Sequence, residues 1–301
     1  MQSSALRALL DGAIDYAGLF PPAGLGMVAA VENYASYRRG PHHWALGRFV
    51  LPSTRLAEFE QAAEPLLPRG PSDSPWRVAT LIGGDAAGEL RAVGEFNCRH
   101  AADGAGAVSA DVVEGKADSV EAVERLLSLV PSYLQAFVEI PLGRDRAPLL
   151  AAIARAGGRA KMRTGGITAD AFPAAAELAR FIRGCLSADL PFKATAGLHH
   201  PLRGDYRLTY DADSVRGTMF GFLNVFLATA FLSGRFDDPE AELLLDERRP
   251  EAFRFDDTGV EWRGRRIGLE VIRRIRTRGV VSFGSCSFTE PIGDLESLGL
   301  L

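Results

Sequence analysis

The chain has 301 residues, of which 47% are hydrophobic and 24% charged, and its formal net charge is −4. This balance is typical of a globular protein with a full core, and it gives no electrostatic reason to expect a nucleic acid or an anionic membrane as partner. Three widely spaced cysteines argue against a disulfide scaffold, and the N-terminus does not resemble a signal peptide, so we predict a cytoplasmic location.

Short apolar runs alternate with longer helical patterns along the chain. The predicted strands are residues 14–20, 47–52, 76–82, 107–113, 135–140, 159–164, 190–196 and 280–286. The predicted helices are residues 27–37, 56–67, 87–100, 119–129, 146–156, 169–186 and 219–232. This alternation implies parallel strands joined by right-handed crossovers. Eight such units predict an α/β fold, a (β/α)8 TIM-type barrel; a doubly wound sheet is disfavoured because no GxGxxG motif follows the first strand.

The stretch from about 204 to 279 breaks this alternation. It contains the apolar helix at 219–232, an acidic helix near 239–247, a hairpin at 253–264 and a helix at 269–276. Asp257-Thr258-Gly259 supplies the turn of the hairpin. We therefore predict a single barrel domain over residues 1–301, with an insertion after the seventh strand.

The lysines of this chain are few and stand in similar places. There are three lysines against thirty-one arginines, and Lys116, Lys161 and Lys193 each follow or end a predicted strand. Arginine cannot replace lysine where the amine must lose its proton. For Lys116, which lies beside Asp118, a salt bridge is the better interpretation. Lys161 and Lys193 indicate amine chemistry.

The active site of a barrel lies at the carboxyl ends of its strands. Strand alternation places Lys161 and Arg163 on one face of the sixth strand, and it places Lys193 and Thr195 on one face of the seventh strand. Burial lowers the pKa of a lysine, and a second ammonium lowers it further. A neutral lysine can form a Schiff base with a carbonyl carbon. The alternative is that one or both lysines pair with Glu114 or Glu139 in a structural salt bridge.

Residues 134–203 resemble the second half of deoxyribose-phosphate aldolase and its class I aldolase relatives. The chain has Lys161-Met-Arg-Thr-Gly-Gly where that family has Lys-Thr-Ser-Thr-Gly, and Lys193-Ala-Thr-Ala-Gly where it has Lys-Ala-Ser-Gly-Gly. The resemblance implies that Lys161 forms the Schiff base and that Lys193 lowers its pKa. On the fourth strand, SADVVEG resembles the family segment whose Asp relays protons, and Asp111 would match that residue.

Other candidates follow from the same strand ends. Glu139 and His199 are predicted to transfer protons, and Arg163 or Arg203 to bind an anionic group. The segment SFGSC at 282–286 is similar to the family's last strand, which helps to bind phosphate, and glycine-rich loops of this kind offer backbone amides to phosphate. The remaining predicted substrate-binding residues are Thr164, Gly165, Gly166, Gly197, His200, Gly284 and Ser285.

We therefore predict a Schiff-base-forming lyase or aldolase-like enzyme that acts on a small carbonyl compound, phosphorylated or otherwise anionic, without a cofactor or a metal. Cys286 is interpreted as a buried small residue in preference to a nucleophile. Asp15 and Tyr16 are placed near the mouth of the site or in a structural role. The adjacent His199 and His200 are a weak metal signal, because neighbouring side chains on an extended segment point apart.

Two alternatives stay open. The segments KMRTGGITADAF and FVEIPL have a weaker local similarity to the enolase superfamily, which implies a divalent-metal-dependent enolising lyase or isomerase. Only 22 residues separate Glu139 from Lys161, which leaves no room for a further strand that bears a third metal ligand. The other alternative is a non-catalytic barrel that binds a ligand or forms a homo-oligomer. Its interface would be the helix at 219–232, with the phenylalanines Phe220, Phe222, Phe226 and Phe231.

Overall fold

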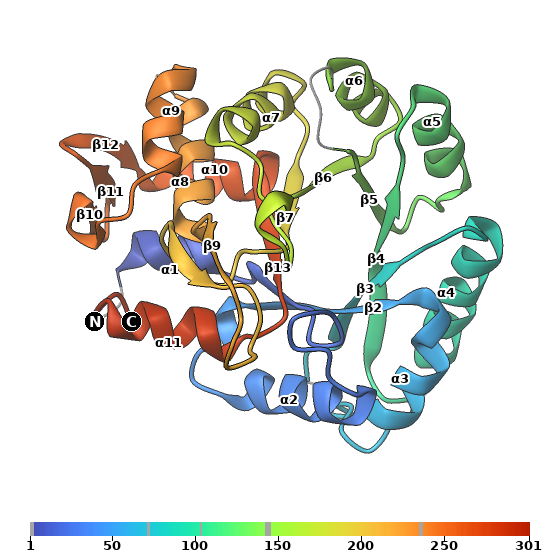
Figure 1. Cartoon of the computed structure of the whole chain (residues 1–301). Helices are drawn as coiled ribbons and strands as arrows, with labels where there is room; N and C mark the ends of the chain where they lie inside the picture. Colours follow the sequence, from blue (N-terminus) through green and yellow to red (C-terminus); the bar gives the residue numbers. More distant parts are fainter. Residues whose placement is uncertain (1–2, 71–72, 103, 142–145, 235–236) are drawn as a thin grey trace.

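The computed structural model describes residues 3–70, 73–102, 104–141, 146–234 and 237–301. Within these residues, eight parallel strands close into a barrel in the order β1-β13-β7-β6-β5-β4-β3-β2 (Figure 1). The (β/α)8 prediction is confirmed, and all eight predicted strands are present. The barrel strands are β1 (Ile14–Tyr16), β2 (Leu46–Pro52), β3 (Trp76–Leu81), β4 (Val108–Lys116), β5 (Gln135–Glu139), β6 (Arg159–Arg163), β7 (Phe192–Thr195) and β13 (Val280–Ser285).

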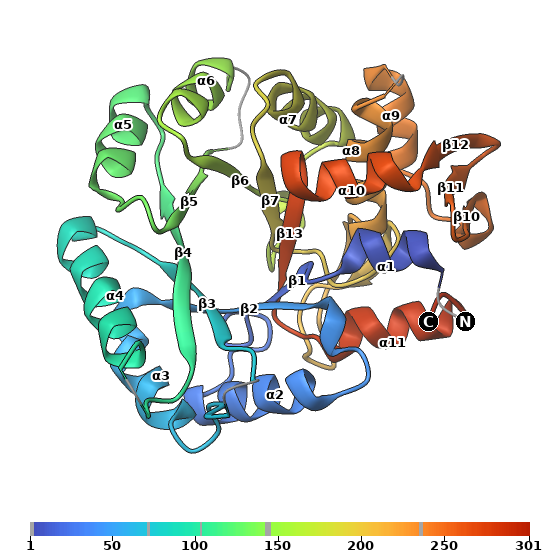
Figure 2. The same ribbon diagram turned by 180° about the vertical axis from the view of Figure 1, so that it is seen from behind.

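A helix follows each barrel strand, and the helices cover the outside of the barrel (Figures 1 and 2). Their starts carry local signals: Asp85 and Ser119 cap two of them by accepting backbone N–H bonds from Gly88 and Ala122. The helices are α2 (Met27–Arg39), α3 (Leu56–Ala63), α4 (Ala86–His100), α5 (Val120–Leu129), α6 (Ala147–Arg155), α7 (Ala175–Ser187), α8 (Phe222–Leu232) and α11 (Thr289–Ser297).

Two predicted boundaries differ from the structure. The predicted helix 169–186 is divided, because α7 begins only after Pro173 and the residue before that proline, Phe172, is extended. The predicted fourth strand ended at residue 113, whereas β4 continues to Lys116. This second difference matters for the site, because it moves Asp111 from the end of the strand toward its beginning.

The remaining elements surround this barrel. The hairpin predicted at 253–264 is present, and a third strand extends it into a small antiparallel sheet. The sequence patterns did not predict the first helix, α11 or the hairpin β8–β9. These elements are α1 (Ser4–Leu10), β8 (Gly204–Arg207), β9 (Arg216–Met219), α9 (Asp238–Leu245), β10 (Phe253–Phe255), β11 (Gly259–Trp262), β12 (Arg265–Gly268), α10 (Leu269–Arg278) and the short 3-10 turns at His43–Ala45, Ser53–Arg55, Ala169–Ala171 and Pro250–Ala252.

Helix α8 belongs to the core of the chain. All its residues are buried, and Phe222 stacks on Phe283 of β13 with ring centroids 4.8 Å apart. It also contacts α7, α9 and α10. The suggestion that the phenylalanines of the predicted helix 219–232 form an oligomer interface is therefore wrong. Their own chain covers all four of them, Phe220, Phe222, Phe226 and Phe231.

The inside of the barrel has a small apolar cluster of its own, made by Val50, Ala79, Val112 and Phe137 from the four consecutive strands β2 to β5. It is separate from the larger core between the barrel and its helices. The site described below lies above this cluster, toward the carboxyl ends of the strands.

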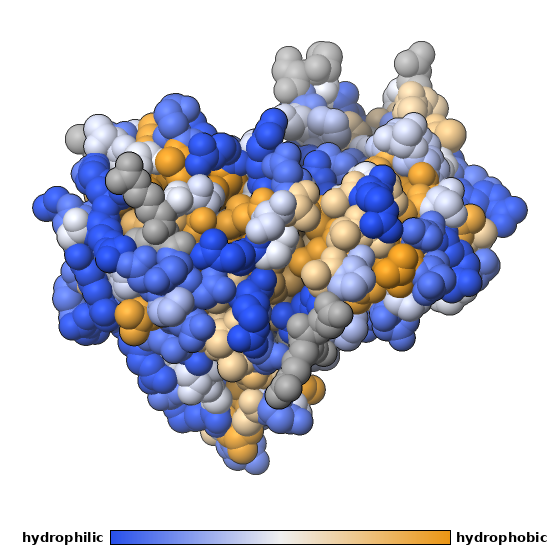
Figure 3. Space-filling model, turned by 90° about the horizontal axis from the view of Figure 1, so that it is seen from above, coloured by the Kyte–Doolittle hydropathy of each residue, from blue (hydrophilic) through white to orange (hydrophobic). Residues whose placement is uncertain are grey.

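The outer surface is mixed in character. On the face shown in Figure 3, hydrophilic residues surround smaller hydrophobic patches. Helices α1 and α11, which lie near the two ends of the chain, are neighbours in both ribbon views. Among the helices that the structure describes, none has the length and apolar character needed to cross a membrane.

Candidate functional site

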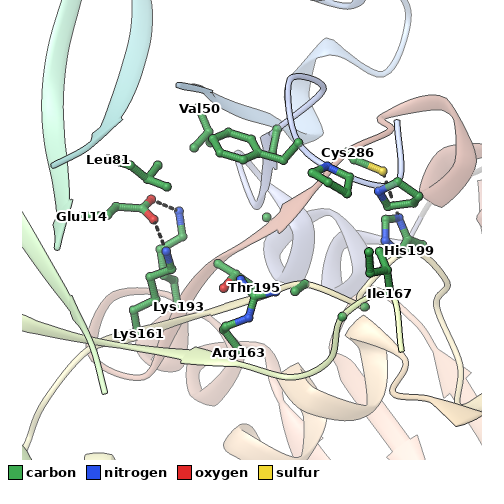
Figure 4. A pocket seen from close by; sticks show the side chains of 18 residues that line it. Val50, Leu81, Glu114, Lys161, Arg163, Ile167, Lys193, Thr195, His199 and Cys286 are labelled. Carbon is green, nitrogen blue, oxygen red and sulfur yellow. Dashed lines mark hydrogen bonds and ion pairs between the residues drawn. The ribbon is translucent and has the colours of Figure 1, made fainter. Parts of the chain in front are cut away.

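Five buried charged side chains form a continuous chain of ion pairs at the carboxyl ends of the barrel strands. Figure 4 shows the central three, Glu114, Lys161 and Lys193. Lys193 Nζ lies 2.6 Å from Asp15 Oδ2 and 2.6 Å from Glu114 Oε1. Lys161 Nζ lies 2.8 Å from Glu114 Oε2 and 2.8 Å from Glu139 Oε2. Acidic and basic groups thus alternate in the order Asp15, Lys193, Glu114, Lys161, Glu139, with Glu114 shared by both lysines.

Strand register explains this convergence. Lys161 and Lys193 are direct partners in the ladder between β6 and β7, and Glu139 is the partner of Lys161 in the ladder between β5 and β6. Partners in a parallel ladder point to the same face of the sheet. The sequence-based expectation that the two lysines share the inner face of adjacent strands is therefore confirmed.

The electrostatics of the lysines differ from the expectation. Burial alone would lower the pKa of Lys193, but the carboxylates of Asp15 and Glu114 raise it above its usual value. Burial alone would raise the pKa of Glu114, and the charges of Lys161 and Lys193 instead lower it to about 2. The ammonium of Lys193, which was expected to act on Lys161 as a neighbouring positive charge, is thus itself paired with two carboxylates.

Neighbouring groups fix the ends of the chain. The Ser282 hydroxyl donates to Asp15 Oδ2 at 2.8 Å, and the backbone N–H of Arg48 donates to Asp15 Oδ1 at 2.8 Å. At the other end, the exposed Lys116 lies 3.5 Å from Glu139, so the salt bridge predicted for this lysine is present. The two hydrogen bonds hold the orientation of the buried Asp15 carboxylate.

A pocket of about 260 Å³ opens above the two lysines. One wall is apolar and is made by Phe20, Pro21, Pro22, Val50 and Leu81. The other lining residues that bear on the chemistry are Glu114, Lys161, Arg163, Gly166, Lys193, Thr195, Gly197, His199, Gly284 and Cys286. A small, half-apolar cavity with a few convergent polar groups is the usual form of a small-molecule site.

Arg163 and Thr195 offer free polar groups to this pocket. They are register partners on β6 and β7, and each lies two residues after a lysine on the same face of its strand. Among the described residues, no carboxylate lies within ion-pair distance of Arg163, and the buried Thr195 hydroxyl has no hydrogen-bond partner. A ligand with an anionic or polar oxygen would satisfy both groups.

A second polar cluster lies away from the lysines in the same pocket (Figure 4). His199 Nδ1 lies 3.7 Å from Cys286 Sγ, 3.4 Å from Ser285 Oγ and 3.4 Å from Glu290 Oε2. Burial would lower the pKa of His199, but its hydrogen bonds to Cys286 and Glu290 raise it to about 9. The predicted residue His199 thus reaches the pocket as a protonated imidazole.

Some predicted residues support the site by shaping its loops, and of these Gly197 also lines the pocket. The Thr164 hydroxyl donates to the Ala196 carbonyl at 2.7 Å and so joins the ends of β6 and β7. Gly165 and Gly197 pack on the Phe172 ring, where a Cβ atom would come within 2.3 and 2.7 Å of it, and Gly197 also has a φ of +69°. These residues shape the loops. Ser285 is buried behind His199.

Three predicted residues lie elsewhere. Asp111 is held by Arg48 and Arg77 near the beginnings of β2 and β3, with Arg48 Nε 2.7 Å from its Oδ1. His200 binds Asp294 at 2.6 Å and stacks on the Tyr206 ring, and Arg203 binds Asp246 at 2.7 Å. Each of the three side chains is thus held by another part of the chain, and none of the three lines the pocket.

Sequence reasoning missed part of the site. Glu114 was named from the sequence only as a possible salt-bridge partner of the lysines, and the structure confirms that pairing. Glu114 and not Asp111 is the β4 acid at the lysines, because strand alternation from Val112 puts Glu114 on the inner face. For Asp15 the available signal was an acid between the apolar residues of a short buried strand. Tyr210 and Glu290 reach Cys286 and His199 from a hairpin and a helix that the patterns did not predict, so nothing in the sequence placed them there.

The metal-dependent alternative finds no support in the geometry. Across the described ranges of the chain, no three His, Cys, Asp or Glu side chains converge in the way that a metal ion requires. Glu114 and Glu139 both use their carboxylates to bind lysine ammonium groups.

Comparisons with known proteins leave the family open. No family model matches the chain, and no curated protein matches it by sequence. One similar solved structure is the spore cortex-lytic enzyme SleL of Bacillus cereus, with 12% sequence identity and a TM-score of 0.42 over 96% of this chain and 73% of that chain. At this level of similarity the function has to be argued from the geometry of the pocket.

Proposed function

We propose that the protein is an enzyme that forms a Schiff base between Lys161 and a small carbonyl substrate and then cleaves or forms a carbon–carbon bond. The observation that carries this proposal is the position of Lys161. Its amine lies in the pocket at the carboxyl ends of the strands, between two carboxylates that are each 2.8 Å away. Such neighbours can take and return the protons that imine chemistry moves.

Lys161 and Glu139 alone can supply and accept every proton that imine formation moves. The ammonium passes one proton to Glu139, and the neutral amine adds to the carbonyl carbon. The carbonyl oxygen then takes one proton from the nitrogen and one from Glu139 and leaves as water. The products are a protonated imine on Lys161 and an ionised Glu139, which is ready to act as a base in the next step.

Bond cleavage follows from the electron demand of the protonated imine. The bond between the carbons α and β to the imine breaks, and its electron pair moves toward the imine nitrogen. A carboxylate takes the proton of the hydroxyl group on the departing β-carbon. That carbon leaves as an aldehyde, and an enamine stays on Lys161. In this scheme Lys193 keeps Glu114 ionised and oriented, and Arg163 binds the anionic group of the substrate.

Reductive trapping tests the proposal directly. The whole protein is incubated with cyanoborohydride and a panel of small aldehydes and ketones, some carrying a carboxylate or a phosphate, and the adduct is located by peptide mass spectrometry. We expect a stable adduct on Lys161 in at least one carbonyl class.

The matched controls keep the positive charge. Lys161→Arg should abolish the adduct, because a guanidinium does not form an imine. Lys116→Arg, at an exposed ion pair, should leave it unchanged. A panel that labels Lys116 but never Lys161 would overturn the proposal.

A further inference from the structure

The Cys286 thiol has an environment that the lysine chemistry does not use. It lines the same pocket as Lys161, and three hydrogen-bonding groups surround its sulfur. These are His199 Nδ1 at 3.7 Å, the Tyr210 hydroxyl at 3.5 Å and a backbone group of Ala23. Tyr210 comes from the loop between β8 and β9, and His199 follows β7, so separate segments converge on one sulfur atom.

This environment favours the thiolate. Burial would raise the pKa of Cys286, but the hydrogen bond and the positive charge of His199 outweigh burial and lower it. The Glu290 carboxylate lies 3.4 Å from His199 Nδ1 and holds the imidazole in its charged form. The same carboxylate accepts a hydrogen bond from the Tyr210 hydroxyl at 3.0 Å. The other titratable group near the sulfur is Tyr16, whose pKa burial raises to about 12. A cysteine beside a protonated histidine is the usual form of an activated nucleophile.

We propose that Cys286 and His199 form a second nucleophilic centre of this pocket, which binds aldehydes covalently as thiohemiacetals. The sulfur adds to the aldehyde carbon, the carbonyl electron pair moves to the oxygen, and that oxygen takes the proton from His199. The step needs no oxidant and no leaving group, and it reverses when the oxygen returns the proton. It goes beyond the proposed imine chemistry, because Lys161 takes no part in it.

The surroundings favour a carbonyl ligand over a disulfide role. A thiolate that forms a disulfide needs a second thiol, and the other cysteines of this chain lie elsewhere. Cys98 is exposed on α4 and Cys185 is buried in α7. The proton that a thiohemiacetal oxygen requires is already present on the imidazole beside the sulfur.

The pH dependence of alkylation tests the activated thiol. The full chain with Cys98→Ser is treated with iodoacetamide between pH 6 and 9, and modification of Cys286 is followed by peptide mass spectrometry, with N-acetylcysteine as the reference. Between pH 7 and 9 the reference rate should rise about twentyfold as its thiol ionises. The Cys286 rate should change less than about threefold, and His199→Asn should restore a steep rise. A steep rise in the protein with His199 intact would overturn the activated pair.

The aldehyde is tested separately from the lysine. In Lys161→Arg, millimolar propionaldehyde should slow the alkylation of Cys286 reversibly, whereas acetone should not. With ¹³C-labelled propionaldehyde, the wild-type protein should show a thiohemiacetal carbon signal that Cys286→Ser lacks. If both effects are absent while cyanoborohydride still traps a carbonyl compound at Lys161, this inference is overturned and the proposed function stands. Failure of trapping with both effects present would overturn only the proposed function.

Discussion

Arg163 brings a positive charge to the pocket that no carboxylate within the described residues neutralises at ion-pair distance. Its register partner Thr195 adds a buried hydroxyl without a hydrogen-bond partner. The sequence predicted that Arg163 or Arg203 binds an anionic group. It could not distinguish the two, because both lie close in the chain to the carboxyl end of a strand that bears a lysine. Only the structure shows that Arg203 is bound to Asp246.

At this scale we predict that Arg163 selects anionic substrates. In Arg163→Gln, cyanoborohydride trapping of pyruvate at Lys161 should become about tenfold slower, which corresponds to about 1.4 kcal/mol. Trapping of acetone should stay within about twofold. The exposed Arg155, which binds Glu124, provides the control Arg155→Gln, and it should change neither rate. Equal losses for pyruvate and acetone would argue against a charge-selective role.

The strands β4, β6 and β7 act together through Glu114. The sequence placed Lys161 and Lys193 correctly, because strand alternation depends only on local geometry. It left open whether the two lysines pair with carboxylates, because that depends on what the other strands supply. The early end assigned to β4 favoured Asp111 as the catalytic acid and left Glu114 as a salt-bridge alternative, although the two are only three residues apart.

The acid stability of the protein should depend on Glu114. Its pKa is about 2 in the folded state and 4.5 as the usual value, so its contribution to stability is fully present above pH 4.5 and is lost as the pH falls toward 2. Between pH 5 and 2 the wild type should lose about 3 kcal/mol more of its free energy of unfolding than Glu114→Gln loses.

Urea denaturation at a series of pH values measures this difference. Glu114→Gln should already be less stable at pH 7, because it leaves two buried lysines with fewer partners. The control Glu270→Gln removes an acid that is exposed on α10, and it should follow the wild type at every pH. Parallel curves for the wild type and Glu114→Gln would contradict the ionised chain.

At the scale of the whole molecule, the segment after β7 completes the barrel. Helix α8 covers β13, and the hairpin β8–β9 carries Tyr210 to Cys286. The sequence showed α8 as strongly apolar on all sides, which is typical of a buried helix. It could not show whether the same chain or a second copy covers that surface, because both give the same pattern.

The burial of α8 predicts a large and concentration-independent loss of stability in Phe226→Ala. The Phe226 side chain is fully buried against Phe283, so its removal should cost about 3–5 kcal/mol. Leu243→Ala on α9, where the side chain is 56% exposed, should cost less than about 0.5 kcal/mol. Denaturation at two protein concentrations provides the measurement, and a midpoint for Phe226→Ala that rose with concentration would indicate an intersubunit role.

The sequence by itself determined the barrel, its eight strands and the inward direction of Lys161 and Lys193, because hydrophobic alternation and strand parity are local properties of the chain. The tertiary structure decided which charges meet. Asp15 and Glu114 reach the lysines across the barrel, and His199, Tyr210 and Glu290 gather around Cys286 from separate loops and helices. Such contacts depend on barrel closure and on loop positions, which pair residues far apart in the chain and leave no periodic pattern in the sequence.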